Sequence, residues 1–108
     1  MEKAFDEELY KMVSINDLIV FCIFSVVGKK EKCDFERLAQ ECFKMFPKTF
    51  SFSKIAKWPD ARKLDRPLRA LREKRIINGA SESFFTLTPA GEKAAETLNK
   101  IFRQRKLL

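Results

Sequence analysis

Residues 68–98, LRALREKRIINGASESFFTLTPAGEKAAETL, contain the signals that decide the fold. The stretch opens on the second half of an amphipathic helix that we expect over residues 60–74. Leu64, Leu68 and Leu71 recur every three or four residues, so they form one apolar stripe along that helix. The stripe predicts that one side of the helix packs on a core, while the other side faces solvent.

Pro67 interrupts this helix. A proline in a helix interior removes one hydrogen bond and clashes with the preceding turn, at a cost of about 3 kcal/mol. We therefore expect a kinked or two-part helix. In the two-part form the regular helix begins near Asp65, with Asp65 as its cap and Pro67 in the first turn.

The second half of the stretch predicts a hairpin and a last helix. Apolar runs flank Asn78-Gly79, which is typical of a β-hairpin, and we expect strands within residues 75–87. Thr88-Pro89 is typical of a helix start, with Thr as the N-cap and Pro as the first helical residue. An apolar face then continues to about residue 106, which predicts a helix over residues 89–106.

Two further helices are predicted upstream. Ser14 is the expected N-cap of a central helix over residues 15–27, which is apolar on nearly all sides, and Gly28 is its expected left-handed C-cap. Asp34 is the expected N-cap of an amphipathic helix that ends before Pro47. Residues 1–13 are expected to form a short helix or a docking arm.

The order of these elements, helix, helix, basic helix, hairpin, helix, is that of a winged helix-turn-helix. Residues 68–98 resemble the recognition helix, wing and following helix of MarR-like and PadR-like winged-helix regulators, which carry the pattern L..L...GLI, a hairpin and then LT..G. The matching residues are Leu68, Leu71, Ile76, Ile77, Leu87, Thr88 and Gly91. The chain departs from the pattern at Arg75, where these regulators have Gly, and in a longer link before the third helix.

The resemblance implies one winged-helix domain over residues 1–108, mainly α with a small β-hairpin, built as a three-helix core, a wing and a C-terminal helix. It also implies a transcriptional regulator that places its third helix in the major groove of duplex DNA. A homodimer is implied as well, with the first helix, the N-terminal segment or the last helix as its interface. Phe84 and Tyr10 are further candidates for a dimer patch.

The charge distribution favours an anionic partner. The net charge is +7, and residues 54–75 carry nine basic against three acidic residues, whereas residues 1–20 carry two basic against five acidic. On the third helix, Arg62, Arg66 and Arg69 are spaced four and three apart, opposite the leucines. Arginine can bind guanine bidentately or hold a phosphate.

The expected DNA-binding residues are Arg62, Lys63, Arg66 and Arg69 on the helix, Lys54 and Lys57 as backbone contacts, and Ser81 at the wing tip. The basic cluster from Lys100 to Lys106 is either a phosphate contact or a solvated terminus. For the arginines, the alternative is a solvated helix face with local pairing to Asp65 or Glu73.

A second hypothesis is a winged helix that serves as a protein-interaction module in a larger complex, because fold alone does not decide function. The aromatic link from Phe50 to Trp58 and the lack of a basic residue at the wing tip favour it. Core or lid packing is the expected role of Trp58. A basic stripe on the third helix favours DNA instead.

Enzymatic activity, a cofactor and a metal site are not expected. The chain has no histidine, no glycine-rich phosphate loop and no zinc-binding spacing among its three cysteines. The longest apolar stretch, residues 18–27, is too short to span a membrane, which needs about 20 residues. Reduced, structural cysteines predict a cytoplasmic protein.

Overall fold

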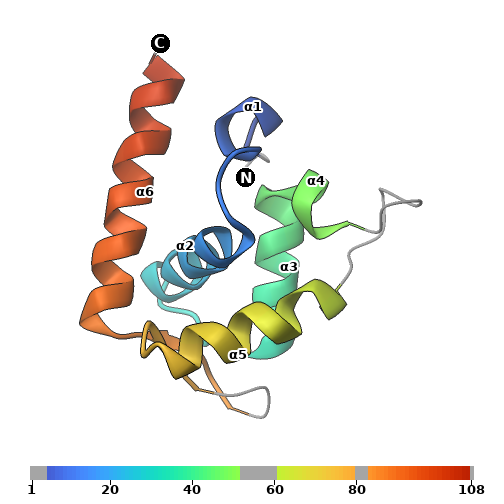
Figure 1. Ribbon diagram of the computed structural model, residues 1–108, viewed down its shortest axis with the longest axis vertical. Helices are drawn as coiled ribbons and strands as arrows, with labels where there is room; N and C mark the ends of the chain where they lie inside the picture. The colour runs from blue at the N-terminus through green and yellow to red at the C-terminus, as the bar shows by residue number, and fades with distance from the viewer. Residues whose placement is uncertain (1–4, 52–60, 80–82, 108) are drawn as a thin grey trace.

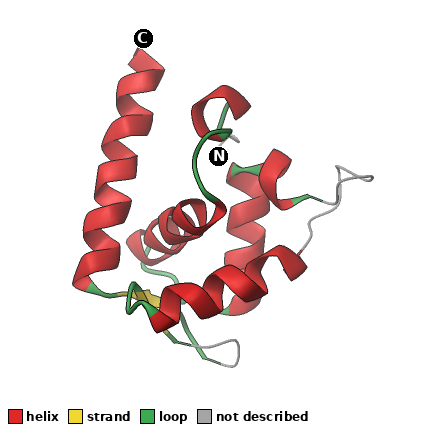
Figure 2. Cartoon of the chain, viewed as in Figure 1, coloured by secondary structure: helices red, strands yellow, loops and turns green. Residues whose placement is uncertain are grey.

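The computed structural model describes residues 5–51, 61–79 and 83–107. This part of the chain is mainly helical with a small two-stranded antiparallel sheet (Figures 1 and 2), as the sequence predicts. Its elements are α1 (Glu7–Tyr10), α2 (Ile15–Gly28), α3 (Phe35–Met45), α4 (Pro47–Phe50), η1 (Ala61–Leu64), α5 (Asp65–Glu73), β1 (Ile77–Asn78), β2 (Thr86–Leu87) and α6 (Pro89–Leu107).

The central helix is α2, which contacts α3, α5, α6 and β2. Leu18, Ile19, Val20 and Cys22 point in different directions around the helix and are all buried, because the helix is apolar nearly all round. Ser14 caps it as predicted, since its hydroxyl accepts a hydrogen bond from the Asp17 backbone N–H at 3.2 Å. In the view of Figure 1, α2 lies between α6 on one side and α3 on the other.

The expected role of Gly28 is wrong. Gly28 is the last residue of α2, and the left-handed residue comes two positions later at Lys30, with a φ of 62°. The Glu31 N–H then returns to the Val26 carbonyl at 3.3 Å, which closes a Schellman motif. A lysine therefore takes the conformation that glycine prefers, and Gly28 faces open space.

The N-terminal arm contains the short helix α1 and packs on the core through aromatic rings. The Phe5 ring stacks on Phe46 with centroids 5.3 Å apart and lies 5.0 Å from the Phe102 ring of α6. Tyr10 is buried, and its hydroxyl accepts a hydrogen bond from the Lys48 N–H at 3.2 Å. Tyr10 is therefore a core residue, and its suggested place in a dimer patch is wrong.

The helix α3 is amphipathic and capped by Asp34, whose carboxylate accepts a hydrogen bond from the Arg37 N–H at 2.7 Å, as predicted. Pro47 both follows α3 and begins α4, so the longer link expected before the third helix starts with a helical turn. The rest of that link, residues 52–60, lies outside the described residues, and so does Trp58.

The third helix has two parts, as Pro67 predicts. The turn η1 is a 3₁₀ helix, and the α-helix α5 begins at Asp65, so that Pro67 lies in its first turn. Asp65 is the first helical residue, and Leu64 takes the cap position without a side-chain hydrogen bond. The expectation that Asp65 is the cap is therefore wrong by one residue.

The hairpin and α6 complete the fold. The two strands pair antiparallel, with Ile77 opposite Leu87, and are shorter than the sequence suggests. Thr88 caps α6 as predicted, since its hydroxyl accepts a hydrogen bond from the Gly91 N–H at 3.2 Å and donates toward the Ile76 carbonyl at 2.9 Å. This hydroxyl joins the start of α6 to the residue just before β1, so it holds the helix against the hairpin.

Candidate nucleic-acid interface

One side of the third helix is fixed against the core. Leu64, Leu68 and Leu71 are all buried, as the apolar stripe predicts, and α5 packs against α2 and β1. Burying a leucine stabilises a protein by about 1.5–3 kcal/mol relative to leaving it exposed. Three such anchors in three turns leave the helix little freedom to rotate, so its opposite face has a defined direction.

The opposite face carries arginines. Arg66 and Arg69 are exposed, and neither forms an ion pair with Asp65, Glu73 or any other residue in the part of the chain that the structure describes. Arg62 is exposed in the preceding turn, η1. The local pairing that would mark an ordinary solvated face is absent for Arg66 and Arg69 among the described residues. Their guanidinium groups keep five N–H donors each for an external acceptor.

Lys63 has a different environment. Its ammonium group donates to the Thr49 carbonyl at 3.0 Å and to the Ser51 carbonyl at 2.7 Å. These carbonyls lie at the end of α4, where a helix leaves acceptors without partners, so the lysine satisfies them and joins η1 to α4. Lys63 therefore has a structural contact that its position in the sequence did not indicate.

A small hollow of about 80 Å³ lies between α5 and the hairpin. It is lined by Asp65, Leu68, Arg69, Arg72 and Phe85. At its edge, the Arg72 guanidinium donates to the Gly79 carbonyl at 3.3 Å. Arg72 thus reaches from α5 to Gly79, just after β1 of the hairpin. The basic face of α5 and the hairpin therefore form one continuous surface.

The connector between α2 and α3 adds basic residues beside the hairpin. The Phe85 N–H donates to the Cys33 carbonyl at 2.8 Å, which places this connector along β2. Lys32 is exposed, and its ammonium lies 5.1 Å from the centre of the Phe84 ring, which is itself 48% exposed. Nothing local in the sequence reveals this hydrogen bond, because Cys33 and Phe85 lie far apart along the chain.

The remaining predicted contacts divide into two groups. Lys54, Lys57 and Ser81 lie outside the described residues. In the C-terminal cluster, Lys100 and Arg103 are exposed on α6, at a distance along the chain from α5, and the side chains of residues 105–107 are not described. The structure therefore brings together Arg62, Arg66 and Arg69, and adds Arg72.

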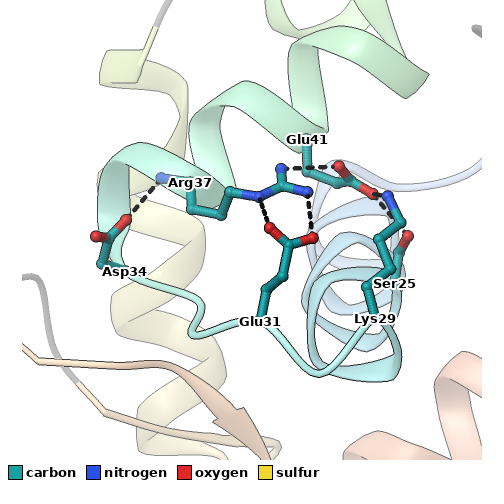
Figure 3. A network of polar contacts seen from close by, with 6 residues as sticks. All are labelled: Ser25, Lys29, Glu31, Asp34, Arg37 and Glu41. Carbon is teal, nitrogen blue, oxygen red and sulfur yellow. Dashed lines mark hydrogen bonds and ion pairs between the residues drawn. The ribbon is translucent and has the colours of Figure 1, made fainter. Parts of the chain in front are cut away.

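The chain also contains a buried ionic network, shown in Figure 3. Glu41 of α3 has a completely buried side chain and accepts hydrogen bonds from Ser25 at 2.6 Å, Lys29 at 2.8 Å and Arg37 at 2.9 Å. Arg37 also pairs with Glu31 of the connector at 3.2 Å. Both carboxylate oxygens of Glu41 are thus occupied by residues of α2 and α3.

This network serves the fold. Burial alone would raise the pKa of Glu41, but the hydrogen bonds from Lys29, Ser25 and Arg37 outweigh burial and hold the pKa below its ordinary value. The ionised carboxylate fixes the end of α2 against α3 and so positions the connector beside the hairpin. A buried charge with all its partners in the chain needs no ligand.

Known proteins supply no analogy for this surface, since no protein family, curated protein or solved structure matches the chain. In the described ranges, no group of three or more potential ligands could hold a metal ion. None of the helices described is long and apolar enough to cross a membrane.

Proposed function

We propose that the chain binds duplex DNA as a winged-helix protein and acts as a transcriptional regulator, with η1 and α5 in the major groove. The observation that carries the proposal is the exposed pair Arg66 and Arg69, without ion pairs among the described residues, on a helix fixed by three buried leucines. A helix fits the major groove of B-DNA, and arginine is the side chain that most often contacts guanine there.

The element order supports the winged-helix arrangement. Three helices, α2, α3 and the two-part η1–α5, precede an antiparallel hairpin, and a further helix follows it. The helix α5 ends in a Schellman motif at Arg75, whose φ of 57° lies in the left-handed region. This is the position where the similar regulators carry Gly, so the backbone conformation agrees with the resemblance even though the residue differs.

The surface around α5 has the charge for a phosphate backbone. Arg62 lies one turn before Arg66, Arg72 reaches to the wing turn, and Lys32 lies beside Phe84 on the hairpin. Contacts to phosphates supply most of the non-specific affinity for DNA and release bound counterions. The proposal therefore predicts binding that falls steeply as salt is added.

The test is fluorescence anisotropy of labelled random duplex DNA, titrated at several salt concentrations. We expect non-specific affinity of roughly 10⁻⁴ to 10⁻⁶ M at physiological salt. The double variant Arg66→Ala/Arg69→Ala should bind more weakly, and its slope of log affinity against log salt should be shallower by about 1–2.

The matched control is Lys11→Ala/Lys44→Ala. It removes the same charge from exposed positions on the N-terminal arm and α3, and it should keep the wild-type slope. No binding at low salt contradicts the proposal and favours the protein-interaction module. An equal loss of DNA affinity in both variants would mean that the net charge of the protein, and not the arginines of α5, determines binding.

A further inference from the structure

An open groove lies between the end of α2 and the start of α6, next to β2. It has a volume of about 300 Å³, and its lining includes Phe24, Val27 and Gly28 of α2, Leu87 of β2, and Glu92 and Glu96 of α6. In the view of Figure 1, α6 lies along one edge of the molecule, on the far side of α2 from α3. None of the lining residues belongs to η1 or α5, so this groove is separate from the arginine face.

The α2 side of the groove leaves apolar side chains open to solvent. Phe24, Val27 and Gly28 lie within about one turn of each other, so they share one face of the helix. Val27 is 41% exposed, one of three large apolar side chains left open in the described residues, and Phe24 is half-buried. Exposed apolar surface that polar residues border is typical of an interaction site.

The α6 side of the groove is acidic and lacks a cation of its own chain. Glu92 and Glu96 are exposed, lie one turn apart on α6, and form no ion pair with any described residue, including Lys100 one turn further on. The chain as a whole has a net charge of +7. A cationic partner is therefore attracted to this groove while the net charge of the protein repels it elsewhere.

The spacing of the two carboxylates favours a helical partner. Four residues of an α-helix rise by about 6 Å, so two basic residues four apart on a second helix beside α6 match the spacing of Glu92 and Glu96. Apolar residues three or four positions from them then face Phe24 and Val27, as when an amphipathic helix binds in an apolar groove. The stems of lysine and arginine cover further apolar surface while their charged ends reach the carboxylates.

The described part of this chain does not offer such a helix to a second copy of itself. Its exposed large apolar side chains are Met12, Val27 and Phe84. Met12 and Phe84 lie outside the helices, and Val27 belongs to the groove itself. The leucine stripe of the basic helix α5 is buried in the core. The occupant that fits the groove is therefore a different protein.

We propose that this groove binds a basic amphipathic helix of a second, different protein. Lysines or arginines of the partner, four residues apart, pair with Glu92 and Glu96, and its apolar face covers Phe24 and Val27. The groove and the arginine face belong to different elements, so the partner leaves α5 uncovered. This surface is additional to the DNA-binding face, does not replace it, and is tested in the absence of DNA.

The test begins with an NMR titration of the ¹⁵N-labelled protein with a synthetic helical peptide of about 18 residues, or five turns. The peptide carries leucines every three or four residues on one face and lysines four apart beside them. We expect the largest shifts at the backbone amides of the groove residues in α2, β2 and α6. A peptide with glutamates in place of the lysines, and one of the same composition in scrambled order, should not bind.

Fluorescence anisotropy of the labelled lysine peptide then measures its affinity for groove variants. Glu92→Gln/Glu96→Gln should bind about fivefold more weakly, because two exposed ion pairs are lost. Val27→Asn should bind about tenfold more weakly, because the partner no longer covers an apolar side chain. All three positions are exposed, so the variants should fold, which circular dichroism checks.

Two variants outside the groove are the matched controls. Glu36→Gln/Glu73→Gln removes the same charge from exposed positions on α3 and α5, and Met12→Asn changes an apolar side chain that is 85% exposed. Both should bind the peptide like wild type. No binding of the lysine peptide, shifts centred away from the groove, or groove variants with wild-type affinity would each overturn the proposal. So would a dimer of the chain that Val27→Asn disrupts, since a second copy then occupies the groove.

Discussion

Gly28 and Gly91 show how far the effect of one residue type depends on its surroundings. A Cβ at Gly28 would meet nothing within 4 Å, whereas a Cβ at Gly91 would overlap the Ile76 carbonyl oxygen where α6 begins beside β1. We expect Gly28→Ala to stabilise the protein by about 0.5–1 kcal/mol, because alanine costs less backbone entropy in a helix. Gly91→Ala should destabilise it by about 1–3 kcal/mol, because backbone must move.

Urea denaturation of the two variants measures both effects with one identical substitution. Two changes of the same sign would contradict this account of the Gly91 contact.

The ionisation of Glu41 makes the stability of the fold depend on pH in the acidic range. Its folded pKa lies below its ordinary value, and the unfolded value is about 4.3. The stabilisation by the ionised carboxylate is therefore full above the unfolded pKa and is lost as the pH falls through the folded pKa. We expect Glu41→Gln to lower the free energy of unfolding by about 1–3 kcal/mol at pH 7.

The difference between wild type and Glu41→Gln should shrink below about pH 4. Denaturation curves from pH 7 to pH 3 measure it, with Glu36→Gln on the exposed face of the same helix as the control. If the difference in the free energy of unfolding stays constant with pH, the charge of Glu41 does not contribute to stability.

Residue roles were predictable where the partner is close in sequence. Ser14, Asp34 and Thr88 were identified as caps because a cap and its N–H lie within three residues. The contacts of Lys63 with Thr49 and Ser51, and those of Glu41 with Ser25 and Lys29, were not predicted, because these partners lie 12 to 16 residues away. Nothing in a local pattern reveals such a contact.

At the scale of elements, the end of α5 is held by a residue in an unfavourable conformation. Arg75 has a φ of 57°, and the Ile76 N–H returns to the Leu71 carbonyl at 2.9 Å. A non-glycine residue in the left-handed region costs about 1–2 kcal/mol of conformational energy. Glycine avoids this cost, but it loses more backbone entropy on folding, which cancels part of the gain. We expect Arg75→Gly to stabilise the protein by up to about 1 kcal/mol.

The matched control for Arg75→Gly is Lys74→Gly, one residue earlier, where φ is −81°. At Lys74 a glycine relieves no conformational strain, and it loses more backbone entropy on folding, so this variant should be less stable than wild type. Thermal unfolding measures both, and destabilisation by Arg75→Gly would contradict the left-handed backbone at this residue.

Element types followed from the sequence better than element ends. The three long helices, the hairpin and the break at Pro67 were predicted, because periodicity and proline sterics act locally. The left-handed cap at Lys30, the turn α4 and the short strands were not, because tertiary packing decides where an element stops. The stripe of leucines on α5 was predicted, and its outward arginines followed from the same helical geometry.

At the scale of the whole molecule, burial in the core is expected to leave the cysteines unreactive. Cys22, Cys33 and Cys42 are free thiols, and all three are buried. Burial raises the pKa of Cys33 to about 12 and raises that of Cys22 as well. The reactive form of a thiol is the thiolate, so the native protein should not react with thiol reagents at neutral pH.

The inert thiols allow a new cysteine to report contact with DNA. Labelling Arg69→Cys with a photoactivatable crosslinker attaches the probe to the outward face of α5, and Lys44→Cys places the same probe on α3 as a control. The wild type, given the same labelling, should carry no probe and give no crosslink.

The measurement that tests the central claim most directly is this crosslinking to duplex DNA at low salt. Each labelled variant is first shown to be folded, and fluorescence anisotropy shows that it still binds DNA. We predict strong crosslinks from position 69 and few from position 44, because the proposal places α5 in the major groove and Lys44 lies on another helix, α3. Equal crosslinking from both positions, or crosslinks from position 44 alone, would contradict the assignment of α5 as the DNA-binding helix.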